Sequence, residues 1–390
     1  MAAVRLKADW AEGWLALGVA QRAMGETALS IKSFSECLRI NPQKTEALYD
    51  RACASLDLAD RERGLDDLGV LLKLEPSHLN GRLRRARLLL NAAPEQAIED
   101  LNLVVAQDRE NSDGWLMRGI AWAIAGDVDR ALADLNVACR LNSTNSEPWL
   151  ERGRLLRRSG QAKEAVSDLS MAVQLSPKNT DAMVELARAY AELGNTNAAT
   201  ANLNQVLQIN PGHSEARLVR ATLLSSSKDY ETALKDLEAV KASAATSGED
   251  KSTKILVSLE RARCLEGAGK PEEAIAELAR TLETDPSNID ALNIRARLLR
   301  ELNREDEAVE TYTRLISLSR EQSPLLYERA LLHRKAGRRD FALEDLNELL
   351  RQNPNHVAGL VARAAVYSDK NEPALAAADL TQALRIDPKN

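Results

Sequence analysis

Apolar and polar positions along this chain follow the period of an amphipathic helix. Residues three or four positions apart fall on one face of a helix. The segment 146–179 shows this spacing twice, first in Trp149, Gly153 and Leu156 and then in Ala165, Leu169 and Ala172. It therefore predicts two helices joined by a short turn.

The two-helix pattern returns about every 34 residues from one end of the chain to the other. Eleven repeats can be laid out: 11–44, 45–78, 79–111, 112–145, 146–179, 180–213, 214–247, 255–288, 289–322, 323–356 and 357–390. The columns that contain Gly153 and Ala165 hold small residues throughout, and small side chains let two helices approach closely. Proline after a second helix, as at Pro177, and glycine between helices, as at Gly160, are typical helix-ending signals.

This unit resembles the tetratricopeptide repeat, whose signature is Trp, Leu, Gly and Tyr on the first helix, then small residues and a terminal proline. The resemblance covers nearly the whole chain. It implies an all-α fold, a right-handed superhelical solenoid of antiparallel helix pairs. It also implies a scaffold that binds a protein or peptide on the concave face, which in this family is lined by first helices.

Irregularities in the array predict its domain organisation. Residues 1–10 align with the tail of a preceding repeat, so we expect a segment of a longer protein. Repeats one to seven occupy 11–247 and repeats eight to eleven occupy 255–390. The insertion 248–254 between them is expected to be a hinge or an early start of the next helix. The third repeat is one residue short near 91–95, which predicts a tighter inner turn.

Charge and composition narrow the range of partners and compartments. A net charge of −6 over 390 residues implies neither a nucleic acid nor an anionic membrane as partner. No apolar run approaches the ~20 residues of a membrane span, and the first residues lack the apolar core of a signal peptide. The four cysteines are scattered singly, as in a reducing compartment. We expect a cytoplasmic protein, or alternatively part of a larger exported or membrane-associated one.

The sequence contains no recognisable catalytic motif. A phosphate-binding glycine loop, a GxSxG elbow, an HExxH motif and a Cys or Ser with a plausible His are all missing. The repeat frame keeps His78, His213, His333 and His356 far apart, so neither a metal nor another cofactor is expected. We predict a non-catalytic interaction scaffold. The alternatives are the specificity arm of a larger enzyme, a recruitment arm of a secretion or assembly complex, and a rigid spacer.

Arginine and acid recur together in fixed columns of the repeats. Nine first helices carry an arginine directly before the small residue: Arg51, Arg85, Arg118, Arg152, Arg220, Arg261, Arg295, Arg329 and Arg363. Their second helices carry an acid, with Thr311 the exception: Asp67, Asp100, Asp134, Asp168, Asp236, Glu277, Asp345 and Asp379. The repeats with Leu17 and Leu186 have Ser33 and Asn202 instead. We predict that the two columns touch, as architectural pairs.

The candidate binding face is formed by the first helices of repeats three to six. Its predicted residues are Arg84, Arg87, Leu116, Ile120, Arg154, Arg157, Arg158 and Arg188. Their basic surplus indicates an extended, acidic peptide, although Arg154 and Arg188 can be neutralised by an acid three residues earlier. Ordinary solvated surface is the alternative. The Lys–Asn pair with which some relatives hold a peptide carboxylate is missing.

The last repeat predicts self-association. No further repeat follows to cover its second helix, and uncovered apolar surface tends to find a partner. The residues expected to lie on that face are Leu375, Leu380, Ala383 and Leu384.

Overall fold

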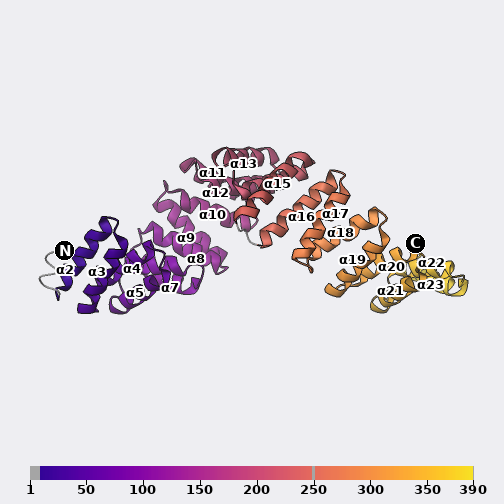
Figure 1. Ribbon diagram of the computed structural model, residues 1–390, viewed down its shortest axis with the longest axis horizontal. Helices are drawn as coiled ribbons and strands as arrows, with labels where there is room; N and C mark the ends of the chain where they lie inside the picture. The colour runs from indigo at the N-terminus through magenta and orange to yellow at the C-terminus, as the bar shows by residue number, and fades with distance from the viewer. Residues whose placement is uncertain (1–8, 248–250, 390) are drawn as a thin grey trace. The chain divides into compact units, whose positions relative to one another are not determined.

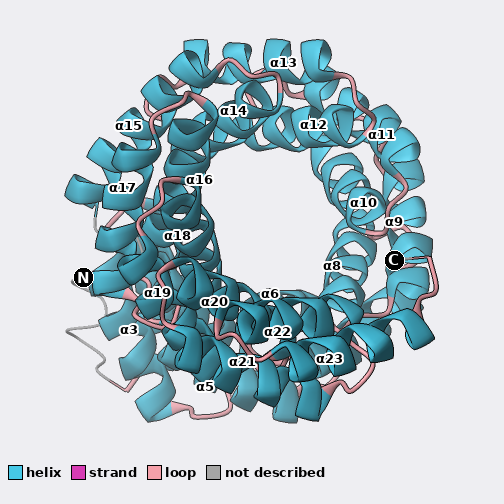
Figure 2. Cartoon of the chain, turned by 90° about the vertical axis from the view of Figure 1, so that its right-hand side faces the viewer, coloured by secondary structure: helices cyan, strands magenta, loops and turns pink. Residues whose placement is uncertain are grey.

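The computed structural model describes residues 9–247 and 251–389, and all regular structure in these ranges is helical (Figure 1). Helices and loops alone are seen when this part of the chain is coloured by secondary structure (Figure 2). The chain divides into two compact parts, Met1–Asn202 and Leu203–Asn390, called here the N-terminal and the C-terminal part. The predicted all-α array of antiparallel helix pairs is confirmed.

Each repeat contributes a first and a second helix. In repeats one to six the first helices are α2 (Ala11–Ala23), α4 (Thr45–Asp57), α6 (Leu79–Leu89), α8 (Ser112–Ile124), α10 (Ser146–Arg158) and α12 (Thr180–Glu192). Their second helices are α3 (Thr27–Ile40), α5 (Arg61–Leu74), α7 (Pro94–Gln107), α9 (Val128–Leu141), α11 (Ala162–Leu175) and α13 (Thr196–Ile209). Most consecutive first helices of this part contact each other, with α8 and α10 on the inner side of the N-terminal part and α9 and α11 on its outer side (Figure 2).

The same alternation continues in repeats seven to eleven. The first helices are α14 (Ser214–Ser226), α16 (Lys251–Gly267), α18 (Ile289–Glu301), α20 (Ser323–Lys335) and α22 (Val357–Asp369). The second helices are α15 (Tyr230–Ser247), α17 (Pro271–Thr284), α19 (Glu305–Leu318), α21 (Arg339–Gln352) and α23 (Pro373–Ile386).

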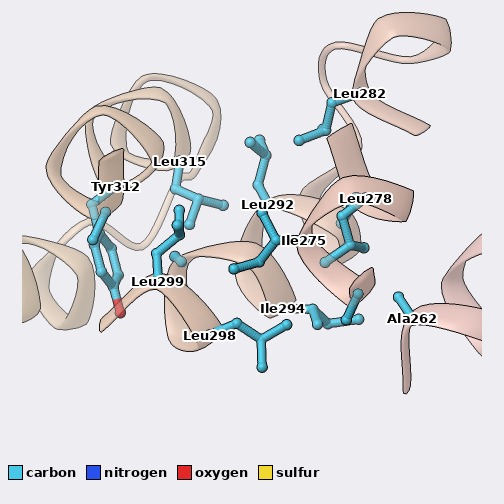
Figure 3. Packing of buried hydrophobic residues seen from close by; sticks show 14 of the residues in the cluster. Ala262, Ile275, Leu278, Leu282, Leu292, Ile294, Leu298, Leu299, Tyr312 and Leu315 are labelled. Atoms are coloured by element: carbon cyan, nitrogen blue, oxygen red, sulfur yellow. The ribbon is translucent and has the colours of Figure 1, made fainter. Parts of the chain in front are cut away.

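The small columns allow the two helices of a repeat to pack closely. A Cβ added to Gly153 would lie 2.6 Å from Cγ of Leu169 on the partner helix, too close for any side chain. Ala165, which faces this contact from the second helix, is fully buried. In the C-terminal part, Leu278 of α17 and Leu292 of α18 belong to one buried cluster that spans two repeats (Figure 3). The core is thus a row of small clusters, as expected where each repeat packs only on its neighbours.

Side chains in the inter-repeat turns cap the first helices. Nδ1 of His78 accepts a hydrogen bond from the Gly81 amide at 3.0 Å, and His213 and His356 do the same in their own repeats. Asn179 accepts from the Ala182 amide at 3.0 Å. Each bond satisfies one of the free amides at a helix start, so three of the four histidines have a structural role.

The short third repeat departs from its prediction. Helix α6 has 11 residues, whereas α4 has 13, and the turn from Leu90 to Ala93 is longer than the three-residue turn in the repeat before it. The Ala93 amide closes this turn on the Leu89 carbonyl at 2.7 Å. The prediction of a tighter turn is wrong: the missing length comes out of helix α6, and Pro94 stands at the start of α7.

The insertion between repeats seven and eight lengthens the helices beside it. Helix α15 has 18 residues, and α16 has 17 and begins at Lys251, ahead of the expected boundary at 255. Residues 248–250 lie outside the described ranges, as do residues 1–8 of the expected tail repeat 1–10. A hinge at 248–254 stays a prediction. Among the described helices, none has both the length and the apolar character needed to cross a membrane.

The last helix leaves three leucines uncovered. Leu375, Leu380 and Leu384 of α23 keep between 43% and 51% of their surface exposed. Ala383 was expected on the same face, but it is buried against Leu360 inside the last helix pair. The expected association surface therefore loses Ala383, and association itself stays a prediction.

Candidate binding site on the first helices

The predicted contact between the arginine and acid columns is confirmed in seven repeats. In the fifth, Arg152 donates from Nε and NH2 to the two carboxylate oxygens of Asp168, at 2.6 and 2.7 Å. The same fork is formed by Arg51–Asp67, Arg85–Asp100, Arg118–Asp134, Arg220–Asp236, Arg329–Asp345 and Arg363–Asp379. These carboxylates are buried, so the column belongs to the architecture and is inaccessible to a ligand.

The remaining guanidinium nitrogen of each arginine, NH1, contacts the preceding repeat. This contact was not predicted from the sequence. NH1 of Arg152 donates to the side-chain oxygen of Asn136 on α9 at 2.7 Å. Equivalent acceptors in other repeats are Ser35, Asn102, Asn204, Thr313 and Asn347. One side chain therefore joins two repeats. The polar residues that recur at the acceptor position of the second helices could have indicated this contact from the sequence.

Two arginines of the column lack the fork. Arg295 faces Thr311, its closest carboxylate is Glu307 at 3.8 Å, and its buried Nε has no hydrogen-bond partner. Arg261 is 3.6 Å from Glu277, whose carboxylate instead accepts from Lys241 at 3.0 Å. The exception at Arg295 was expected from Thr311. At Arg261 the predicted contact is a looser ion pair without the fork, because a longer acid and an extra lysine change the geometry.

A second set of ion pairs joins consecutive first helices in some repeats. Arg22 of α2 binds Asp57 of α4 at 2.9 Å. Arg157 of α10 binds Glu185 and Glu192 of α12 at 2.9 and 2.6 Å. In the C-terminal part the matching pairs are Arg300–Glu328 and Arg334–Asp369. These side chains bridge the two helices that they join.

These pairs reduce the predicted basic surplus. Arg154 is bound to Glu151 at 2.7 Å, and Arg157 is held by two glutamates. Arg188 on α12 is half-buried and has an interaction of its own. Three of the six predicted arginines remain exposed and outside ion pairs among the described residues: Arg84, Arg87 and Arg158.

The groove is open from α4 to α10. No ion pair of the second set joins consecutive first helices over this stretch of the described chain. The reason lies in the sequence: Leu56, Leu90 and Ala123 occupy the positions that Arg22 and Arg157 occupy in repeats one and five. Without an arginine there, no ion pair of this set reaches the next first helix in the described part of the chain.

A first pocket of about 270 Å³ lies in this open stretch, between α4, α6 and α8. Its polar rim includes Tyr49, Asn80, Arg84, Arg87 and Asp113, and its apolar lining consists of Leu56, Leu83, Leu88 and Met117. A hydrogen bond with Tyr49 on α4 raises the pKa of Arg84. The two exposed guanidinium groups make the pocket suited to a carboxylate on an otherwise apolar segment.

A second pocket of about 440 Å³ lies between α8 and α10. Ile120, Ala123, Ile124, Val128, Leu135 and Leu155 give it an apolar lining, with Glu151, Arg158 and Ser159 at the rim. Leu116, predicted to share this face with Ile120, is 4% exposed and packs into the core with Leu135. Ile120 can meet a ligand here, whereas Leu116 belongs to the core.

The cysteines offer no accessible nucleophile. Cys37, Cys53, Cys139 and Cys264 are all buried. Burial raises the pKa of Cys139 to about 11, so its thiol is protonated at neutral pH. The side chains of the open groove can bind but have no activated nucleophile among them.

Models of known protein families match most of the repeats in this chain. Sequence models described as the tetratricopeptide repeat match residues 11–44, 91–146, 156–201, 192–251, 259–324 and 327–390. None of the curated proteins matches the sequence.

Several solved structures are similar to this chain. A tetratricopeptide repeat protein from Parabacteroides merdae is 19% identical with a TM-score of 0.48, covering 68% of this chain and 98% of that one. Yeast Tom70 is 13% identical with a TM-score of 0.42, covering 97% and 92%. YrrB, titled a TPR protein with an unusual peptide-binding site, is 22% identical with a TM-score of 0.39, covering 47% and 95%. Values at this level carry no information about a shared ligand.

Proposed function

The chain belongs to the tetratricopeptide repeat family, and we propose that it binds an extended, acidic segment of a partner protein along the first helices α4 to α10. Tetratricopeptide repeat proteins are generally non-catalytic interaction scaffolds, and stacked repeats create extended binding surfaces. The proposal specifies where on this array the partner binds and which chemical character the bound segment has.

The observation that carries the proposal is the gap in the second set of ion pairs. Arg22–Asp57 bridges α2 and α4 on one side of the stretch, and Arg157–Glu185 bridges α10 and α12 on the other. Between them lie the two pockets described above, which together span α4 to α10. Because no ion pair of the second set bridges these helices, a partner can place its side chains in the groove without first breaking an ion pair.

The charges favour an acidic ligand. Arg84 and Arg87 can each offer two parallel N–H groups to a carboxylate, the geometry in which arginine binds acids most strongly. Leu56 and Met117 beside them lower the local dielectric, so such a contact is worth more there than in bulk water. The second pocket suits a large apolar side chain. The four first helices from α4 to α10 are separated by three gaps of ~10 Å, which a segment of about nine extended residues would span.

The test is fluorescence anisotropy with labelled peptides of about this length, each with two adjacent glutamates and one leucine placed at varied spacing. Replacing Arg87 by glutamate should weaken binding about tenfold or more, chiefly by slowing association. Binding should also weaken as salt rises, because exposed charges are screened over about 8 Å at physiological ionic strength.

The matched control is Arg140→Glu. Arg140 is exposed on the second helix α9, and the charge change is the same. It should leave peptide affinity unchanged. If both substitutions weaken binding equally, the effect comes from the net charge of the protein and not from a specific site. If the glutamate peptides bind no better than a control peptide with glutamine in place of glutamate, the proposal is overturned.

A further inference from the structure

We infer that a third pocket, between α2 and α4, binds a lysine or arginine side chain of the same partner segment. The inference rests on the proposed function and adds to it: the partner segment would carry a cation close to its acidic residues. An acidic segment without a basic residue would fill only part of the groove.

The third pocket has about 430 Å³ and is lined by Val19, Arg22, Ala23, Phe34, Asp50 and Asp57. Arg22 is committed to Asp57, with contacts of 2.9 and 3.0 Å. The Asp50 carboxylate has neither a hydrogen bond nor an ion pair within the described ranges. The pocket therefore combines apolar walls with one uncompensated negative charge.

The chain itself contains a filled version of this site. Repeats five and six place Arg154, Arg157, Glu185 and Glu192 where repeats one and two have Val19, Arg22, Asp50 and Asp57. Glu185 there accepts from Arg157 at 2.9 Å, and Arg154, which binds Glu151 at 2.7 Å, also lies 3.8 Å from Glu185. Both acids of that groove are thus compensated by arginine.

In repeats one and two the second arginine is missing, because Val19 stands where Arg154 would be. Val19 is 48% exposed and leaves the pocket open above Asp50. A guanidinium or ammonium group from a partner would take the place that Arg154 occupies four repeats later. This internal equivalence identifies the missing group as a cation.

The surroundings of Asp50 favour a long basic side chain. Burial raises the pKa of Asp50, Arg22 lowers it and Glu46 raises it again, so the carboxylate lacks full compensation. Val19 and Ala23 can cover the methylene stem of a lysine or arginine while its charged end reaches Asp50. A small inorganic cation would leave these apolar walls in contact with water.

The position of the pocket sets the spacing of the ligand charges. Helix α4 lines both this pocket, through Asp50, and the first pocket, through Tyr49 and Leu56. Neighbouring first helices are ~10 Å apart, which an extended chain covers in about three residues. The partner segment is expected to hold its basic residue roughly three to six residues from its glutamates.

The experiment compares two labelled peptides in anisotropy titrations: the glutamate-containing peptide with a lysine about four residues away, and the same peptide with methionine in place of lysine. The full chain should bind the lysine peptide about tenfold more tightly. Asp50→Asn should abolish that difference and leave the affinity for the methionine peptide unchanged. Asp66→Asn, on the exposed face of α5, is the matched control and should preserve the difference.

Val19→Arg provides a second, independent variant. The new arginine should fill the pocket as Arg154 does in repeat five, and so abolish the preference for lysine without removing Asp50. Circular dichroism checks that both variants fold.

The failures of the two ideas are distinguishable. If both peptides bind equally to the natural chain and Arg87→Glu weakens both, the third pocket is not a cation site and the proposed function stands. A lysine preference that survives both Asp50→Asn and Val19→Arg also overturns the inference. If Arg87→Glu weakens neither peptide, the proposed function itself fails.

Discussion

Arg152 holds Asp168 through two parallel hydrogen bonds of 2.6 and 2.7 Å, and its remaining nitrogen donates to Asn136 at 2.7 Å. The arginine is on α10, the aspartate on α11 and the asparagine on α9 of the preceding repeat. One guanidinium group thereby fixes the pairing within a repeat and the stacking between repeats. This explains why the arginine and its acid occur together in the sequence.

Asp168→Asn should destabilise the protein by about 2–3 kcal/mol. Removing one partner of a buried pair costs up to about 5 kcal/mol, and less is expected here because the Arg152 side chain keeps 18% of its surface exposed. A double-mutant cycle with Arg152→Gln in urea unfolding should give a coupling above about 1 kcal/mol. Glu164→Gln, an exposed change on the same helix, is the control. Additive effects of the two substitutions would contradict a direct pair.

Thr311→Asp should stabilise the ninth repeat. The substitution restores the missing carboxylate opposite Arg295, whose buried Nε has no partner. A hydrogen bond to a charged group is worth about 1.5–3 kcal/mol, part of which is lost in burying the new charge, so a gain of about 1 kcal/mol is expected.

Thr311→Asn is the comparison for the Arg295 site, because asparagine has the size of aspartate without its charge. It should gain less in the same urea titration. A loss of stability with aspartate would show that Glu307, 3.8 Å away, already supplies the needed charge.

Ala59→Gly should stabilise the turn between α4 and α5. Ala59 has φ = 60°, a left-handed conformation that costs a residue with a Cβ about 1–2 kcal/mol. Glycine does not have this cost in the folded state. It also increases the conformational entropy of the unfolded chain, which lowers the free energy of unfolding by up to about 1 kcal/mol. The net gain in thermal or urea unfolding is expected to be about 0.5–1 kcal/mol.

The matched substitution is Ala92→Gly in the turn of the third repeat. Ala92 is exposed like Ala59, but its φ is not positive. This substitution should lower the free energy of unfolding by about 0.5 kcal/mol, since its only effect is to increase the conformational entropy of the unfolded chain. The same sign of effect at both alanines would be incompatible with a strained Ala59.

His333 should make stability depend on pH between about 7 and 5. Burial lowers its pKa below the ordinary 6.5; Asp345 opposes this shift, while Arg329 and Arg338 reinforce it. The buried Nδ1 has no hydrogen-bond partner, and the ring stacks on Phe341 at 5.4 Å between ring centres.

The sign follows from proton binding. Below pH 6.5 the unfolded chain takes up a proton that the folded chain refuses, so the contribution present above pH 6.5 is lost as pH falls. His333→Phe should flatten this part of the dependence of the unfolding temperature on pH. An unchanged slope in the variant would assign the dependence to other groups.

The helical repeats and the forks could be predicted from the sequence because they depend on spacing within one repeat. Turns, caps and small columns recur in phase, and Arg152 and Asp168 keep the same separation as their counterparts in most other repeats. Two residue types that recur together at one fixed separation indicate that the two positions are in contact within each repeat. The exceptions, at Arg261 and Arg295, occur where the second column departs from aspartate.

The candidate site was only partly predictable. Arg84 and Arg87 are exposed as expected, whereas Arg154 and Arg157 are tied up in ion pairs. Leu116 and Ile120 are one helical turn apart, yet the first is buried and the second lines a pocket. Helical period alone cannot separate two such positions, because both lie on the side of α8 that faces its neighbours.

Only the tertiary structure decided which side chains meet across repeats. Arg157 reaches Glu185 and Glu192, and Arg22 reaches Asp57, because consecutive first helices lie side by side at a distance that side chains can span. The sequence determined the helices and the pairing inside each repeat through local periodicity. The stacking of one repeat on the next then decided where the groove is bridged and where it stays open, since that depends on the reach of side chains between neighbouring backbones.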